Sequence, residues 1–195
     1  MMFYLKHKDD TEIRLLELSD AESLFHLTDQ SRNYLREWLP WVDLTQELSH
    51  SESFIRSALK QYSSNKGFQA GIWDKGELAG VIGLQNIDWV NKSTSIGYWL
   101  GEGFQGKGLM TIACKSVIDH CFGQLKLKRI EIRAATGNHK SQAIPERLGF
   151  QKEGCLRSSE FLYDRYLDHY LYGLVNEKQT QKEELKGAFK YDWLA

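Results

Sequence analysis

A glycine-rich turn between an apolar strand and an apolar helix carries the clearest chemical signal in this chain. The turn spans Gln105 to Thr111 and reads QGKGLMT, and the apolar run before it spans Thr94 to Leu100. Glycines at the start of a helix let the backbone approach a ligand closely, and the first helical N–H groups then point at one spot. The helix dipole favours negative charge there. We therefore interpret the turn as an anion site, suited to the pyrophosphate of a nucleotide-like cofactor.

Two other phosphate-binding motifs overlap this turn, and each lacks a group that its chemistry requires. A G-x-G-x-x-G begins at Gly101, but dinucleotide folds need an acidic residue at the end of the next strand to hold the ribose. That strand, 128–135, ends in two alanines followed by threonine. A P-loop needs Ser or Thr after Lys107 to bind magnesium, and Gly108 stands there.

The turn also fits an acyl-CoA pattern, Q-x-x-G-x-[G/A], through Gln105 and Gly108, with Met110 at the position that the pattern gives to a small residue. A second motif, N-x-x-S-x(6)-L-G-F, begins at Asn138, includes Ser141 and follows the next strand directly. At this spacing the two motifs together resemble the GNAT superfamily of acetyl-CoA-dependent N-acetyltransferases. The resemblance covers roughly residues 12–175.

The resemblance implies the GNAT fold, a mixed α+β architecture with a mostly antiparallel seven-stranded sheet flanked by helices. In that fold a central pair of parallel strands, here 94–100 and 129–135, splays apart and holds the pantetheine arm of acetyl-CoA, the implied cosubstrate. Backbone near Trp99 and Leu100 would pair with the pantetheine amides, and the turn would hold the pyrophosphate. The implied cofactor-binding residues are Trp99, Leu100, Gln105, Gly106, Lys107, Gly108, Leu109, Met110, Thr111, Asn138 and Ser141.

Two further segments, 33–42 (NYLREWLPWV) and 166–172 (YLDHYLY), resemble the Rim-type branch, whose members acetylate the N-terminal amine of ribosomal proteins that begin with alanine or serine. The resemblance implies that Tyr34, Trp38 and Trp41 contact the acceptor, although their i, i+4, i+7 spacing equally fits packing in a core or lid. The implied activity is acetyl transfer to the N-terminal α-amine of a protein, ribosomal by this likeness. Acetylation of a small amine or antibiotic, and acetyl-CoA binding without catalysis, remain open alternatives.

The sequence departs from the GNAT pattern at Met110 and at Pro145, which occupies a position where many members carry a tyrosine as general acid. The proton for the leaving thiolate must then come from elsewhere, and Ser141 has the nearest hydroxyl of the motif. Asn138 and Ser141 also suit a turn and a helix N-cap. The Rim-type likeness makes Glu160 the candidate general base, against the alternative of an exposed hairpin charge.

The rest of the chain supplies the elements that must position these residues. Hydrophobic periodicity predicts helices at about 51–62, 108–122 and 141–148 and one after residue 20, and the predicted strands are 12–18, 68–73, 78–87, 94–100, 129–135, 151–157 and 166–175. Hairpins at both ends and one strand–helix–strand crossover imply a mixed sheet with a right-handed parallel connection. We expect one domain over 1–195, with 176–195 as a C-terminal helix or tail.

Composition narrows the partners. The 195 residues are 42% apolar, which suits one well-buried core. A net charge of -1 without a basic block argues against nucleic acid, and the absence of a long apolar window argues against a membrane. Six histidines and three cysteines without ligand spacing predict no metal and indicate a reduced, cytoplasmic protein. The chain is compatible with a homodimer.

Overall fold

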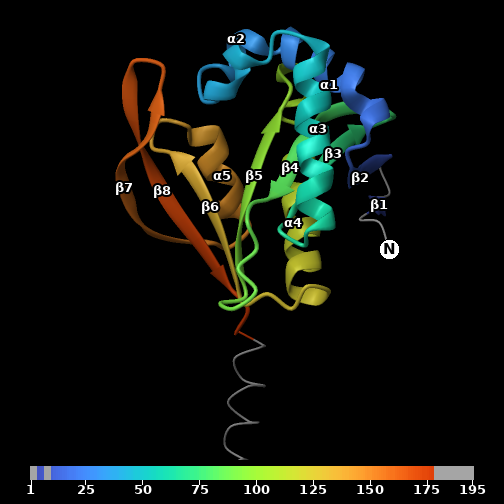
Figure 1. Cartoon of the computed structure of the whole chain (residues 1–195). Helices are drawn as coiled ribbons and strands as arrows, with labels where there is room; N and C mark the ends of the chain where they lie inside the picture. The colour runs from blue at the N-terminus through green and yellow to red at the C-terminus, as the bar shows by residue number, and fades with distance from the viewer. Residues whose placement is uncertain (1–3, 7–9, 178–195) are drawn as a thin grey trace, which may run out of the picture.

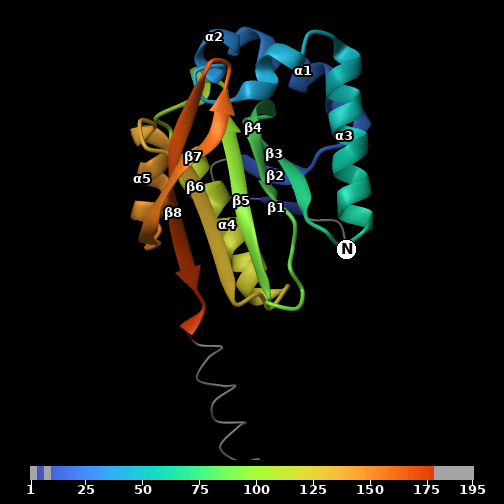
Figure 2. The ribbon, with the colours of Figure 1, turned by 60° about the vertical axis from the view of Figure 1, so that its left-hand side comes forward.

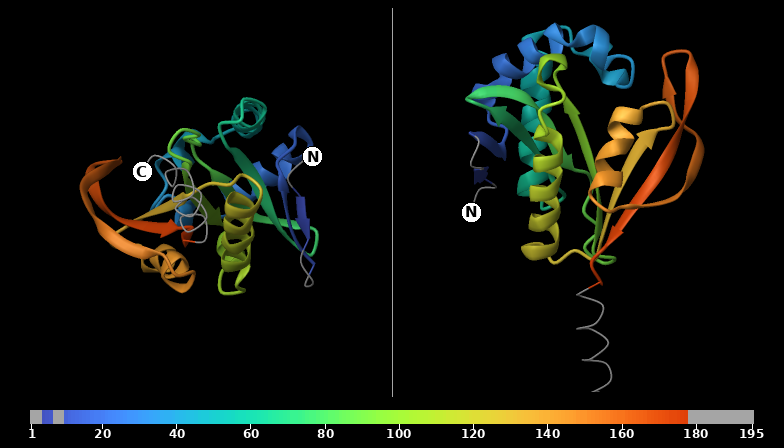
Figure 3. Two further views of the ribbon diagram at one scale, coloured as in Figure 1. Left: turned by 90° about the horizontal axis from the view of Figure 1, so that it is seen from below. Right: turned by 180° about the vertical axis from the view of Figure 1, so that it is seen from behind.

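The computed structural model describes residues 4–6 and 10–177. These residues form one eight-stranded sheet in the order β1-β2-β3-β4-β5-β6-β8-β7, in which only the β5–β6 pair is parallel. Helices α1 and α3 lie on one face of the sheet, whereas α4 and α5 lie on the other (Figures 1 and 3). The predicted mixed α+β architecture is confirmed.

The strands are β1 (Tyr4–Lys6), β2 (Thr11–Leu15), β3 (Phe68–Asp74), β4 (Glu77–Leu84), β5 (Ser93–Leu100), β6 (Arg129–Ala135), β7 (Gln151–Leu162) and β8 (Arg165–Val175). The helices are α1 (Ala21–Gln30), α2 (Arg32–Leu35), α3 (Leu48–Ser63), α4 (Leu109–Gly123) and α5 (His139–Arg147), with short 3₁₀ segments η1 (Leu18–Asp20), η2 (Pro40–Leu44) and η3 (Glu102–Phe104).

All seven predicted strands are present, and β1 is an additional strand at the sheet edge. Its three residues are too few to show the alternation by which strands are predicted. The predicted hairpin between β3 and β4 is confirmed, because Lys75 and Gly76 both adopt positive φ angles, 52° and 86°. Two successive left-handed residues match the twist of the flanking strands.

The sheet separates two apolar layers, and β4 contributes to both. Every residue of β4 after Glu77 is buried. Leu78 and Val81 pack under α1 and α3, whereas Ala79 and Ile82 pack against the layer that includes α4. A strand covered on both faces reads as a continuous apolar run, which explains the unbroken sequence LAGVIGL.

The parallel pair separates part-way along its length. Strands β5 and β6 pair only from Ser93↔Arg129 to Ile96↔Ile132. Beyond this point β5 stays with β4 as far as Leu100, and β6 stays with β8 as far as Ala135. Each strand therefore follows its outer neighbour, and a wedge opens between them toward their carboxyl ends (Figures 1 and 2).

None of the helices formed by the described residues is long and apolar enough to span a membrane. Residues 178–195 lie outside the described part of the chain. The expectation of one domain that ends in a helix or tail at 176–195 therefore stays a prediction.

Candidate active site

A cavity of about 940 Å³ occupies the wedge, a size typical of small-molecule sites. It is lined by residues of α2, β5, the glycine-rich turn and α5. The predicted cofactor-binding residues that line it are Trp99, Leu100, Gln105, Gly106, Gly108, Leu109, Met110, Thr111, Asn138 and Ser141. The structure thus gathers two motifs that are separated by a helix and a strand in the sequence.

The turn has the backbone geometry of an anion site. Gly106 and Gly108 adopt φ angles of 76° and 77°, a region that L side chains rarely occupy. Gly108 is the N-cap of α4 and no side chain caps this helix, so the N–H groups of the first helical turn remain available. Met110 is buried in the core. It belongs to the core cluster and also lines the cavity, so the helix start accommodates the longer side chain as part of the cavity wall.

Lys107 points away from the cavity that its neighbours line. Its Nζ lies 3.1 Å from Asp74 Oδ2 and 4.9 Å from the centre of the Phe104 ring. Two cations of α5, Lys140 and Arg147, line the cavity instead. The sequence analysis did not identify these two residues. Basic residues on the helix of the second motif could have been considered as partners for the anion.

These two cations face the start of α4. Lys140 Nζ donates to Gln105 Oε1 at 2.9 Å, and Arg147 donates to Thr111 Oγ1 at 2.8 Å. Charge-assisted hydrogen bonds to phosphate are stronger than neutral ones. The site can therefore hold a polyanion through backbone N–H groups on one side and side-chain cations on the other.

The inner edge of β5 offers a second set of free backbone groups. On the side that faces β6, β5 has no paired residue beyond Ile96. Trp99 and Leu100 lie in this unpaired stretch and line the cavity. An extended ligand with amide groups can add to such an edge as a strand would.

The start of α5 is held by two hydrogen bonds to Ser141. The side chain of Asn138 caps the helix by accepting the Ser141 N–H at 3.0 Å. The helix begins at His139, two residues before the predicted start at residue 141, so Pro145 lies in its second turn. Proline has no N–H, which leaves the carbonyl of Ser141 without its helical donor.

Tyr98 supplies that missing donor from β5. Its hydroxyl donates to the Ser141 carbonyl oxygen at 2.9 Å. Burial raises the pKa of Tyr98, so the phenol stays protonated and keeps donating. Sequence reasoning did not identify this residue. A proline inside a helix is the signal that an outside donor is needed.

The aromatic segment expected to meet the acceptor crosses the top of the wedge. Tyr34 and Trp38 line the same cavity as the turn, and Trp38 packs against Gly137, where an added Cβ would lie 3.3 Å from its ring. Trp41 packs instead on Trp99, with ring centres 5.6 Å apart. Two of the three residues are thus placed over the wedge and the third lies on the other side of β5.

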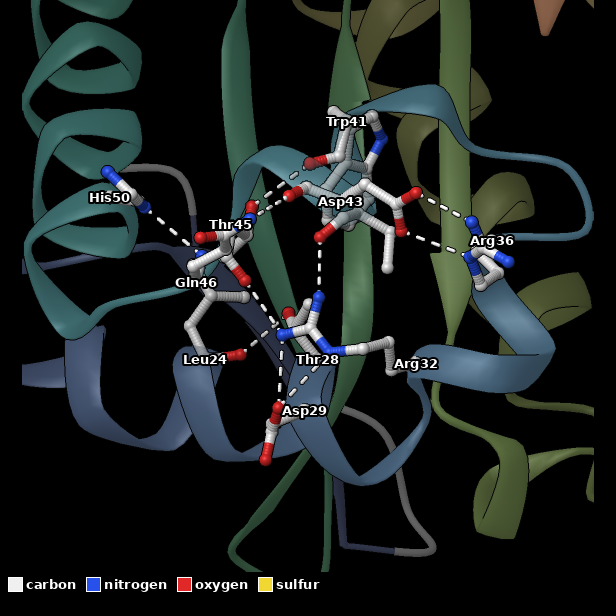
Figure 4. A network of polar contacts seen from close by, with 11 residues as sticks. Leu24, Thr28, Asp29, Arg32, Arg36, Trp41, Asp43, Thr45, Gln46 and His50 are labelled. Carbon is white, nitrogen blue, oxygen red and sulfur yellow. Dashed lines mark hydrogen bonds and ion pairs between the residues drawn. The ribbon is translucent and has the colours of Figure 1, made fainter. Parts of the chain in front are cut away.

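Two arginines hold this aromatic segment in place (Figure 4). Arg32 donates to the carbonyls of Val42 and Thr45, both at 2.7 Å. Arg36 forms a paired contact with Asp43 and lies 4.8 Å from the centre of the Tyr163 ring in the β7–β8 hairpin. These contacts therefore fix the position of the aromatic segment over the cavity.

Residues 11–151 match the family described as acetyltransferase (GNAT) domain. The chain belongs to the GNAT acetyltransferase family. This GNAT protein carries the family's splayed parallel strands and the turn at the start of α4, and the sequence-based prediction of the family is confirmed.

Individual proteins extend the likeness over nearly the whole GNAT chain. YdaF of Bacillus subtilis (strain 168), provisionally named a ribosomal N-acetyltransferase, is 38% identical over 91% of this chain and 97% of its own length. RimL, a ribosomal L7/L12 alpha-N-protein acetyltransferase solved with coenzyme A, has a TM-score of 0.85 at 25% identity and covers 89% of this chain and 98% of its own. The microcin C7 self-immunity acetyltransferase MccE, solved with acetyl-CoA and AMP, has a TM-score of 0.83 at 32% identity, covering 87% and 94%.

The two catalytic candidates of this GNAT protein lie in different surroundings. Ser141 lines the wedge cavity, and no described residue hydrogen-bonds its hydroxyl. Glu160 lies on β7 and lines neither this cavity nor the smaller one on the other side of β5. Its Oε2 is 3.2 Å from Nε2 of His169, although the pair lacks hydrogen-bond alignment. His169 pairs with Ala135 at the end of β6, so Glu160 is close to the wedge without facing into it.

The described residues contain no cluster of side chains that could bind a metal ion. Among residues 4–6 and 10–177, no group of three or more His, Cys, Asp or Glu side chains could hold an ion. The polar groups at the wedge are backbone N–H groups, the cations Lys140 and Arg147, and neutral side chains such as those of Ser141, Thr111 and Gln105. This set suits binding of a phosphate-bearing cosubstrate and proton transfer.

Proposed function

We propose that the protein transfers the acetyl group of acetyl-CoA to the N-terminal α-amine of a protein, with ribosomal proteins as the acceptor class and the cytoplasm as the place. The wedge is the main evidence for acetyl-CoA as the cosubstrate. In it, the unpaired edge of β5 leads to the N–H groups at the start of α4. The ribosomal-protein acetyltransferase activities after which YdaF and RimL are named support this acceptor.

Elementary energetics favour an α-amine over lysine. An amine must be neutral to attack a thioester, and α-amines titrate near pKa ~8 whereas lysine titrates near ~10.4. At pH 7, neutralising these groups costs roughly 1.4 and 4.6 kcal/mol, respectively. An α-amine therefore needs only a weak base, and the described residues that line the wedge cavity include no carboxylate that could serve as a strong one.

The bound acetyl-CoA would supply an acetyl group activated as a thioester. The turn from Gln105 to Thr111 would bind its phosphates, and the edge of β5 would orient its pantetheine arm. Glu160 would take the proton that the attacking amine loses, through a water, and Ser141 would give a proton to the departing sulfur. Holding amine and thioester together would supply most of the rate, and no covalent enzyme intermediate is required.

Two matched peptides test this proposal. One carries a free N-terminus with its lysine blocked, and the other carries a blocked N-terminus with its lysine free. We expect acetylation of the first only, with release of free CoA. Preference for the lysine peptide, or activity on small amines alone, would instead identify a small-amine or antibiotic acetyltransferase, and binding of acetyl-CoA without any CoA release would identify a non-catalytic module.

Variants assign the residues. Ser141→Ala should lower kcat more than it weakens CoA binding, and Glu160→Gln should flatten the acid limb of the pH–rate profile. Trp38→Ala should weaken peptide acetylation, whereas Trp89→Ala, which removes a half-exposed tryptophan outside both cavities, should not. Wild-type turnover of the Ser141 and Glu160 variants at every pH would refute their roles.

A further inference from the structure

A second cavity lies on the other side of β5, beneath η2 and the start of α3. Its volume is about 610 Å³. It shares Leu39, Tyr98 and Trp99 with the wedge cavity. A ligand group in the second cavity would therefore lie directly across β5 from the wedge, where the acetyl donor is proposed to bind.

The walls of this second cavity combine aromatic rings with aliphatic and neutral polar side chains. Trp41 packs on Trp99, and Phe54 presents a ring that is 41% exposed. Among the described residues that line it, none is Asp, Glu, Lys or Arg. His50 is fixed at the rim, since its Nδ1 accepts the Gln46 N–H at 3.1 Å. Burying a charged group here would be costly because no opposite charge compensates for lost hydration.

The roof of the second cavity is braced from behind. Arg32 donates to the carbonyls of Val42 and Thr45, which flank the roof residue Leu44 (Figure 4). The Thr45 hydroxyl donates to the Trp41 carbonyl at 3.3 Å. These bonds fix the 41–45 segment relative to Arg32, so the roof of the cavity has a defined position without a ligand.

We propose that the second cavity binds the side chain next to the accepting amine, and that it selects a bulky uncharged group, aliphatic or aromatic. This rests on the proposed acetyl transfer at the wedge. A serine or alanine side chain would leave most of a 610 Å³ space unfilled, whereas leucine or phenylalanine would bury its surface against the two tryptophans. Each methylene that such a pocket recognises is worth roughly 10-fold or more in kcat/KM.

Peptides that differ only in their first residue test the selection. We expect kcat/KM to be about 10-fold or more higher for peptides that begin with Leu or Phe than for those that begin with Ser or Ala, and lowest for those that begin with Lys or Asp. Phenethylamine and spermidine extend the test to free amines, and phenethylamine should be the better substrate. Equal or better use of Ser, Ala or Lys peptides would overturn the proposal.

A filling substitution locates the effect. Ser53 lies exposed at the rim on α3, so Ser53→Trp should place a ring in the cavity without disturbing the core. Ser57→Trp is the matched control, because Ser57 is also exposed on α3 but lines neither cavity. Ser53→Trp should erase the preference for Leu and Phe while acetyl-CoA affinity and melting temperature stay at the values of the control.

Different results would refute acetyl transfer to a protein N-terminus and side-chain selection by the second cavity. If phenethylamine is acetylated, no peptide is acetylated, and Ser53→Trp abolishes the activity, then the second cavity binds the acceptor but the acceptor is not a protein. If peptides are acetylated at rates that do not depend on the first residue, and the rates are equal in Ser53→Trp and Ser57→Trp, then the proposed function stands but this cavity does not recognise the acceptor.

Discussion

Replacing Tyr98 with phenylalanine should destabilise the protein because it removes the side-chain donor to a carbonyl that Pro145 cannot serve. The Tyr98 hydroxyl and the Ser141 carbonyl oxygen are 2.9 Å apart, and Pro145 cannot supply the helical N–H. An unsatisfied buried acceptor costs about 1–3 kcal/mol. We expect a loss in unfolding free energy near the lower figure, because this contact is partly accessible to water.

A double-mutant cycle with Pro145→Ala isolates this contact. Alanine at 145 restores an N–H that can bond the Ser141 carbonyl, so Tyr98→Phe should cost about 1 kcal/mol less in that background than in the wild type. Urea unfolding at constant m-value measures the four stabilities. Tyr166→Phe, which changes a tyrosine that is 65% exposed, should leave stability unchanged.

The cycle can also show that the Tyr98 hydroxyl does not replace the missing N–H of Pro145. If Tyr98→Phe costs the same with and without Pro145, within about 0.5 kcal/mol, the hydroxyl does not compensate for the proline. Turnover provides a second reading, because the bond ends on the residue proposed to protonate the leaving sulfur. Tyr98→Phe should lower kcat, and Pro145→Ala should restore part of that loss.

Three further predictions use other parts of the molecule. Gly108→Asp should abolish acetyl-CoA binding in calorimetry, whereas Gly76→Asp, at an equally left-handed turn position, should not; equal affinities would remove the anion site from this turn. A thiol reagent should modify only Cys155 in the native protein, because the other two cysteines are buried, and a second native adduct would refute this. Burial lowers the pKa of His120, so its contribution to stability is complete above about pH 6.5 and is lost as the pH falls below it toward the folded-state value. His120→Gln should flatten that slope in melting temperature.

The local features of the site were predictable from sequence because local sequence dictates them. Gly106 and Gly108 take the left-handed angles that only glycine adopts readily, and α4 begins directly after them. The cap of α5 is assigned less well: the sequence suggests Asn138 as a turn residue and Ser141 as the N-cap, whereas Asn138 is itself the N-cap and accepts the Ser141 N–H.

Contacts between distant segments were not predictable in the same way. The Tyr98 hydroxyl reaches Ser141 only because the splayed sheet brings β5 and α5 together. Lys107 points to Asp74 because the β3–β4 hairpin ends beside the turn. Neither partner is marked by spacing along the chain. The predicted start of α5 is two residues too late, because the helix begins at His139, before its apolar pattern does.

Acetyl transfer to an N-terminal α-amine can be measured directly on ribosomal proteins. Ribosomal proteins with free N-termini would be incubated with acetyl-CoA and the protein, and intact masses followed by peptide mapping would locate each added acetyl group. We expect one added group per modified protein, on residue 1, and a smaller yield with Ser141→Ala at the same enzyme concentration and time. Acetyl groups on lysine side chains, or no acetyl transfer to any protein while phenethylamine is acetylated, would contradict this expectation.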